Sequence, residues 1–184
     1  MTPRALLLLA LLVSSAAVAP MSVLATPSEP SATAQEFLDY LLKPGANITT
    51  DTAMRQKWLG TGLRTHFDAA VRAVVDARKR PGVDGPEPAE PGNGTFLDSW
   101  DLPTVCLAER SVTDQDDATV KAVCNWGPKT NYPGVSRDVE VTMGKEGGTW
   151  RIQNIILHKN AYADDGNVLE LLENIRKDAE TAGR

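Results

Sequence analysis

The stretch of sequence that decides the fold is residues 104–126, TVCLAERSVTDQDDATVKAVCNW. It contains two runs rich in apolar and β-branched residues, 104–112 and 118–126, on either side of the polar segment 113–117. Such runs around a polar break are typical of two antiparallel strands joined by a turn. The sequence therefore predicts a β-hairpin whose turn is centred on Gln115.

Both cysteines of the chain lie in this hairpin, Cys106 in the first strand and Cys124 in the second. Folding the hairpin about its centre places them opposite each other, within the Cα separation that a disulfide needs. A disulfide is expected in an oxidising compartment, and two separate buried thiols are the alternative. The spacing is not CxxC, so we expect a structural bridge and not a reactive thiol. The same register makes two further favourable cross-strand pairs, Glu109 with Lys121 and Leu107 with Val123.

A second hairpin is predicted from residues 137–144 and 149–157, which flank the segment 145–148, KEGG. Alternation of apolar and polar residues sets the expected register, because a slip of one residue would move the apolar side chains to the wrong face. Ile155 and Leu157 fall on the opposite face, so we expect the second strand to be central in the sheet, with both faces covered. The predicted pairs are Met143 with Trp150, Val141 with Ile152 and Val139 with Asn154.

Two helices are expected near the start of the chain. The first begins at a capping box formed by Thr33 and Glu36 and ends at residues 43–45, KPG. Asp51 can cap a second helix over residues 52–59, because its carboxylate can accept a hydrogen bond from a free backbone amide of the first turn.

Two further helices are expected, one on each side of the sheet region in sequence. The glycine-containing break 60–62 precedes a third helix over residues 63–78, whose apolar positions repeat at helical spacing. Its basic end, residues 78–80, suits the negative end of the helix dipole, and we favour this interpretation over a binding patch. The last helix covers about residues 165–181.

The chain is expected to form a single α+β domain over residues 26–184, preceded by a signal peptide over residues 1–25. The segment 81–95 is rich in proline and glycine and cannot form a helix or an internal strand. A loop of this length is either a lip over a pocket or an insertion without a role, and we favour the insertion. The predicted parts are helices over about 31–80, this loop, a sheet over about 96–158 and the C-terminal helix.

The first 25 residues have the three parts of a secretory signal peptide. Arg4 supplies the basic start, residues 5–19 are almost wholly apolar, and Val23 and Ala25 provide the small residues of a cleavage site. An uncleaved membrane anchor is the alternative, but the apolar run is shorter than the roughly 20 residues that a spanning helix needs. No cysteine follows the apolar core, so a lipoprotein signal is not indicated. We expect an exported protein, periplasmic or secreted.

The charge of the chain argues against several classes of partner. It carries 19 basic and 24 acidic residues, a net charge of −5, and loss of the signal peptide removes only Arg4. A mildly acidic chain with mixed signs is not typical of a protein that binds nucleic acid or an anionic membrane. No other long apolar run is present, so we expect no membrane insertion after cleavage.

Three stretches resemble a known superfamily: residues 96–104 (FLDSWDLPT), 117–126 (DATVKAVCNW) and 139–156 (VEVTMGKEGGTWRIQNII). They are similar to the nuclear-transport-factor-2-like, or cystatin-like, α+β superfamily, and within it to a bacterial exported domain family of uncharacterised function. The resemblance implies N-terminal helices packed on a curved antiparallel sheet to form a cone. The C-terminal helix departs from the simplest members. Fold does not fix activity, so the resemblance supports the fold more than a function.

No catalytic or metal-binding motif is present. The chain has two histidines, His66 and His158, and no HExxH, CxxC, GxSxG or P-loop pattern. We therefore predict no metal, no cofactor and no catalytic residue.

The strongest candidate contact site is Asp98-Ser99-Trp100-Asp101, together with Tyr132. Ketosteroid isomerases, enzymes of the same superfamily, use an inward carboxylate as a base and a tyrosine or a protonated aspartate as an oxyanion donor. Tyr40, Tyr132 and Tyr162 are the tyrosines that could act as donors here. The simpler interpretation, which we favour, is that the two aspartates cap a turn and that Trp100 is a core residue. Three other tryptophans are also expected in the core or in a pocket wall, Trp58, Trp126 and Trp150.

Three functions fit the sequence. The first is a non-enzymatic exported module that binds an envelope protein or a small ligand, with a toxin-neutralising immunity or inhibitor protein as one form of it. The second is a small isomerase or dehydratase, which needs a carboxylate base inside the cone. The third is an accessory domain with no ligand of its own.

Overall fold

The computed structural model describes residues 29–80 and 89–182. The predicted signal peptide and residues 81–88 of the predicted loop lie outside the described residues. The fold is α+β, as predicted, with helices first, then an antiparallel sheet that does not close, then a last helix. The elements are α1 (Pro30–Leu42), α2 (Thr52–Trp58), α3 (Thr61–Arg78), the 3₁₀ turn η1 (Asn93–Phe96), β1 (Val105–Asp114), β2 (Asp117–Asn125), β3 (Ser136–Glu146), β4 (Thr149–Leu157), β5 (Gly166–Asn167) and α4 (Val168–Thr181).

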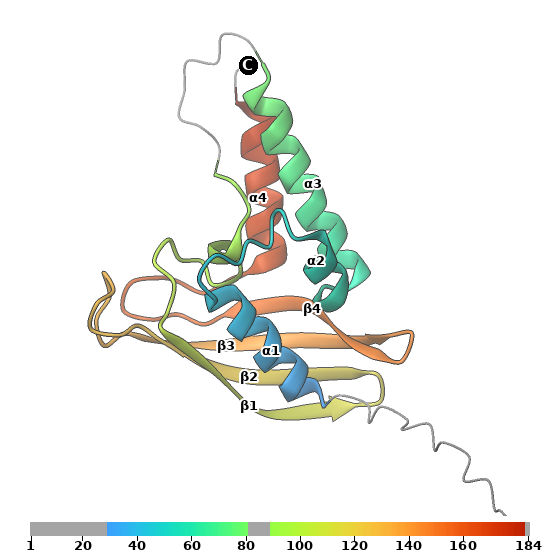
Figure 1. The fold of residues 1–184 in the computed structure, drawn as a ribbon, viewed down its shortest axis with the longest axis vertical. Coiled ribbons are helices and arrows are strands. Elements are labelled where there is room, and N and C mark those ends of the chain that lie inside the picture. The colour runs from blue at the N-terminus through green and yellow to red at the C-terminus, as the bar shows by residue number, and fades with distance from the viewer. Residues whose placement is uncertain (1–28, 81–88, 183–184) are drawn as a thin grey trace, which may run out of the picture.

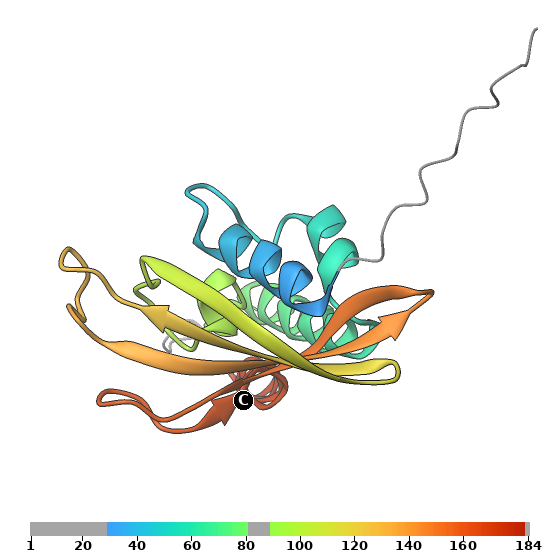
Figure 2. The same cartoon turned by 90° about the horizontal axis from the view of Figure 1, so that it is seen from below.

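The sheet is curved, and its five strands lie in chain order, β1-β2-β3-β4-β5. Helices α1 and α2 lie against one face of this sheet (Figure 2). Helices α3 and α4 lie side by side and extend away from the sheet (Figure 1). The main core therefore lies between the helices and the inner face of the sheet, and a small second cluster joins the outer ends of α3 and α4. The second cluster consists of Val74, Ala77 and Ala179.

The core is built from aromatic and aliphatic side chains of the helices and the inward positions of the strands. Trp58, Trp126 and Trp150 are 4–5% exposed and belong to it, as predicted. Trp100 does not, because 95% of its surface is exposed, so the expectation that it is a core residue is wrong. The largest fully buried side chains include Phe37, Leu38, Leu41, Phe67, Phe96, Ile152 and Ile155.

The first hairpin forms as predicted around Cys106 and Cys124, which are joined by a disulfide. Leu107 pairs with Val123, but the predicted pair of Glu109 with Lys121 is altered by a β-bulge. Two residues of β1, at positions 109 and 110, lie opposite Lys121, because the ladder passes from the pair 108–122 to the pair 111–120. The bulge follows from a turn tighter than expected, with Asp114 already paired with Asp117.

The register predicted for the second hairpin is wrong. Its turn is only Gly147-Gly148, both at positive φ (60° and 78°), which suits glycine and a tight two-residue hairpin turn. Strand β3 is therefore longer than predicted, whereas β4 has the predicted bounds and contains a bulge at Gln153. The bulge turns Ile155 and Leu157 to the same buried face as Trp150 and Ile152. The observed pairs are Lys145 with Trp150, Met143 with Ile152, Val141 with Ile155 and Val139 with Leu157.

Two helices begin earlier than predicted. Helix α1 starts at Pro30, a residue suited to the first turn, and Thr33 is a buried residue inside the helix and not its cap. Helix α3 starts at Thr61, whose backbone N–H and hydroxyl both donate to the carboxylate of Glu146 at the end of β3, at 2.8 and 2.9 Å. The backbone hydrogen bond from Thr61 is the main reason that the pKa of Glu146 is lowered. The prediction that Asp51 caps α2 is confirmed, since its carboxylate accepts from the N–H of Met54.

The basic residues at the end of α3 have partners within the protein. The guanidinium of Arg80 donates to the backbone carbonyls of Glu180 (3.2 Å) and Ala182 (3.0 Å) at the end of α4. Lys79 and Arg78 form ion pairs with Asp76 and Glu90, respectively. The charge run thus joins two helix ends to each other and to the loop that follows α3.

The free edge of β1 and the part of β4 that β5 does not reach are each partly covered by another segment of the chain. The side-chain amide of Gln35 on α1 donates to the carbonyl of Cys106 (2.9 Å) and accepts from the N–H of Ala108 (2.7 Å), as a neighbouring strand would. On the other side, Leu59 forms a bridge with Ile152 of β4, and the N–H of Gly60 donates to the carbonyl of Ile152 (2.8 Å). Covered edges limit the pairing of the sheet with other chains.

Replacing both cysteines, Cys106→Ala with Cys124→Ala, should lower the free energy of unfolding by about 3 kcal/mol, because the bridge closes a loop with a sequence separation of 18. Urea unfolding without reductant measures the change. Reductant should produce a similar loss in the original protein and none in the double variant. An unchanged unfolding midpoint in the double variant would contradict the prediction.

Gln35→Leu should lower stability by about 1 kcal/mol and increase aggregation, because the two edge groups of β1 lose their partner. Chemical unfolding and light scattering at rising protein concentration measure the two effects. Gln56→Leu on the exposed surface of α2 is the matched control and should leave both unchanged. Equal aggregation of the two variants would count against the role of Gln35 at the edge.

Candidate functional site

Three loops meet at one end of the sheet (Figure 1, left): residues 97–104, 126–135 and 158–165. We call these residues the loop cluster. The loops are joined by hydrogen bonds and not by a common strand. The indole N–H of Trp126, for example, donates to the carbonyl of Asp101, which joins the second loop to the first. The cluster is therefore a defined surface built from segments far apart in the sequence.

Arg137, at the start of β3, holds the loop cluster together from below. It is 3% exposed, and among the described residues no other charged residue is buried to this degree. Its guanidinium donates to the carbonyls of Leu97 (3.2 Å), His158 (2.9 Å) and Asp164 (2.7 Å). A buried charge is tolerated when its donors are paired in this way, so the position of Arg137 fixes the first and third loops relative to each other.

The two predicted aspartates play different parts. Asp98 is exposed, has a positive φ of 47° and lies 3.6 Å from the guanidinium of Arg137. The carboxylate of Asp101 accepts from the backbone N–H of Asn131, and its carbonyl accepts from the hydroxyl of Ser99 (2.7 Å). Asp101 therefore fastens the turn that carries Trp100, which agrees with the turn-capping interpretation.

Trp100 is presented on this fastened turn with its ring in solvent. It borders two hollows in the surface, one of about 80 Å³ towards Tyr132 and Tyr162 and one of about 290 Å³ towards Leu171 and Ile175 of α4. The rings of Tyr132 and Tyr162 lie 5.4 Å apart, and Tyr162 is also mostly exposed. The loop cluster thus carries three aromatic side chains around shallow hollows, and two of them, Trp100 and Tyr162, are exposed.

Three of the four predicted contact residues, Asp98, Trp100 and Tyr132, line the same hollow, and Asp101 lies behind them as a fastener. Sequence reasoning missed the part that Arg137 plays. A signal was available, because Arg137 stands at an inward position in the alternation that continues with Val139, and a charged residue there needs buried partners.

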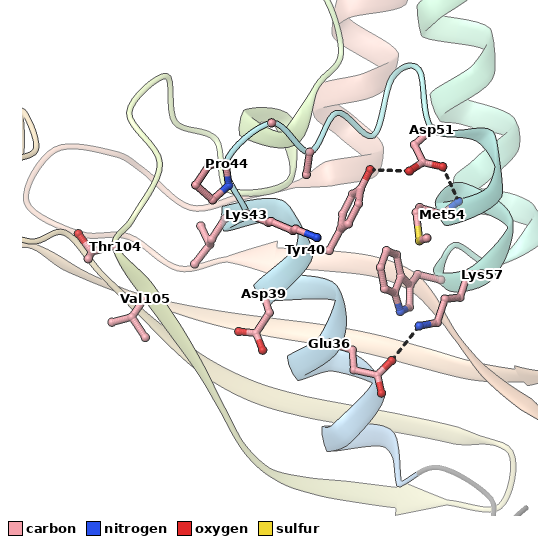
Figure 3. A pocket seen from close by; sticks show the side chains of 14 residues that line it. Glu36, Asp39, Tyr40, Lys43, Pro44, Asp51, Met54, Lys57, Thr104 and Val105 are labelled. Atoms are coloured by element: carbon pink, nitrogen blue, oxygen red, sulfur yellow. Dashed lines mark hydrogen bonds and ion pairs between the residues drawn. The ribbon is translucent and has the colours of Figure 1, made fainter.

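A larger groove lies between α1, α2 and the start of β1, with a volume of about 830 Å³ (Figure 3). The sequence analysis named two of its residues in such a role, Tyr40 as a possible donor and Trp58 as a core or pocket-wall residue, but it did not predict the groove. The phenol of Tyr40 donates to Asp51 (3.3 Å), and burial together with the charge of Asp51 raises the pKa of Tyr40. The residues that carry charge or an aromatic ring in the groove are Glu36, Asp39, Tyr40, Lys43, Asp51, Lys57 and Trp58.

The core holds no acid among the described residues, whose buried polar side chains are Thr33 and Arg137. No group of three or more described histidines, cysteines or acids is placed to hold a metal ion. None of the described helices is long and apolar enough to cross a bilayer.

Comparison with known proteins adds no relative. The chain matches no protein-family model, no curated protein sequence and no solved structure.

Arg137→Met should destabilise the protein by about 3 kcal/mol, because three loop carbonyls lose their donor. Denaturant unfolding measures the loss. Arg110→Met is the matched control, since Arg110 is exposed in the bulge of β1, and we expect it to change stability by less than about 0.5 kcal/mol. Equal stability of the two variants would show that the carbonyl contacts of Arg137 contribute little.

Proposed function

We propose that this protein is an exported, non-enzymatic binding module that contacts a protein partner through the loop cluster. The single observation that carries the proposal is Trp100, 95% exposed on a turn that hydrogen bonds hold in place. Tryptophan, tyrosine and arginine dominate the binding energy of protein interfaces. A fully exposed tryptophan on a fixed turn gains a large apolar contact on binding and loses little conformational freedom.

The shape of the loop cluster favours a protein partner over a small ligand. Pockets for small molecules usually have volumes of about 300–1,000 Å³ and enclose most of the ligand. The hollow lined by Tyr132 and Tyr162 measures about 80 Å³, which suits one projecting side chain of a partner. Trp100 would project into the partner in turn, as interface anchors do.

Export is the second part of the proposal. The sequence of residues 1–25 supports it, and the Cys106–Cys124 disulfide is consistent with an oxidising compartment. Membership of the nuclear-transport-factor-2-like superfamily is also a proposal, supported by helices on one face of a curved antiparallel sheet. The isomerase or dehydratase alternative needs an inward carboxylate, and the described core supplies no observation in its favour.

Trp100→Ala should reduce partner binding more than about tenfold, the loss typical of an interface anchor. The mature chain, fixed to beads, would be used to capture proteins from a cell-envelope fraction, and captured proteins would be identified and their affinities measured. Val112→Ala is the control, because Val112 is also exposed but lies in β1 near the opposite end of the sheet. A partner that binds the Trp100 variant and the original protein equally well would contradict the use of the loop cluster.

A further inference from the structure

The groove between α1 and α2 contains a cation of the protein's own. The ammonium group of Lys57 lies 4.6 Å from the centre of the Trp58 ring and 3.0 Å from the carboxylate of Glu36 (Figure 3). A cation over an aromatic face beside a carboxylate is the arrangement that recognises a basic side chain. The groove therefore shows, with its own Lys57, the chemistry of a site for a cationic group.

Lys57 holds this place weakly. Its side chain is 52% exposed and that of Glu36 is 60% exposed, and ion pairs in such positions contribute little to stability. A guanidinium has two advantages over an ammonium here, because it can bind a carboxylate with two parallel hydrogen bonds and stack flat on an indole. An incoming arginine can therefore replace Lys57, which is free to turn towards solvent.

The other charged residues of the groove also favour a positively charged ligand. Asp39 lies one turn of α1 beyond Glu36, and Asp51 lies on the facing wall (Figure 3). With Lys57 displaced, these three carboxylates face one remaining lysine of the groove, Lys43. An excess of negative charge in the groove favours a basic segment over an acidic one.

Trp58 supplies an independent sign that a partner is missing. It is 4% exposed, and its indole Nε1–H is buried without a hydrogen-bond acceptor. Buried donors of native proteins are nearly all paired, so each exception calls for an explanation. A ligand that moves Lys57 off the ring can bring an acceptor, such as a peptide carbonyl, to this N–H.

We propose that the groove binds an extended segment of a second protein through one arginine, whose guanidinium replaces Lys57 over Trp58 and pairs with Glu36. The groove volume of about 830 Å³ leaves space for the residues on either side of that arginine. This site is separate from the loop cluster, and neither proposal depends on the other.

The probe for this site is the blocked peptide acetyl-Gly-Arg-Gly-amide, with its citrulline analogue as an uncharged match of the same shape. The chain has four tryptophans, so the four indole N–H signals of the ¹⁵N-labelled protein report the two surfaces separately. The arginine peptide should shift the Trp58 signal saturably, and the citrulline peptide should not. A Trp58 signal that ignores the arginine peptide, or that responds equally to both, would overturn the proposal.

Variants test the exchange with Lys57 directly. Lys57→Gln should raise the affinity for the arginine peptide about threefold, and Glu36→Gln should lower it by a similar factor. Lys159→Gln is the matched control, because Lys159 has the same 3.0 Å ion pair, with Asp164, but lies in the loop cluster. It should leave the affinity unchanged, as should Trp100→Ala, which separates this proposal from the proposed function. Weaker binding by Lys57→Gln would overturn the exchange.

Discussion

The buried guanidinium of Arg137 is the constraint on which the loop cluster depends. A charge without water must have each donor paired, and the partners available to Arg137 are backbone carbonyls of two loops that follow different strands and helices. The hydrogen bonds that the guanidinium of Arg137 requires therefore fix the positions of those loops. Hydrogen bonds hold the turn that presents Trp100 on both sides. Arg137 donates to Leu97 before the turn, and Asp101 after it accepts from Trp126 and Asn131. The position of Trp100 on the surface therefore depends on these hydrogen bonds.

The fold class could be read from the sequence, because hydrophobic periodicity and turn residues act locally. The first hairpin was correct at its cysteines, since one cross-link at the open end limits the possible registers. The prediction for the second hairpin fails first at the turn, because only Gly147 and Gly148 form it and not the whole segment 145–148. It fails again at Gln153, which is an inserted bulge residue. A bulge changes which face a strand residue occupies, and nothing in the alternation of residue types marks its position. Helix starts failed for a similar reason, since Glu146 caps α3 from a distant strand.

The candidate surfaces differ in how far the sequence could show them. Asp98, Trp100 and Asp101 are adjacent in the chain, so a local pattern could single them out, and Tyr132 was named beside them. The exposure of Trp100 could not be foreseen, because its neighbours Phe96 and Leu97 are fully buried and suggest a core segment. The groove was missed altogether, since Glu36, Lys57 and Val105 come from three elements that only the tertiary fold brings together.

The Gln35 side chain has a consequence for how this protein can recognise others. A common mode of association adds an extended segment of a partner to the free edge of a sheet, where backbone groups bind with little regard to sequence. At Cys106 and Ala108 those backbone groups are already taken by an amide from α1. Under the two proposals above, recognition uses side chains of the loop cluster and the groove, where a single substitution changes the choice of partner and the sheet stays as it is.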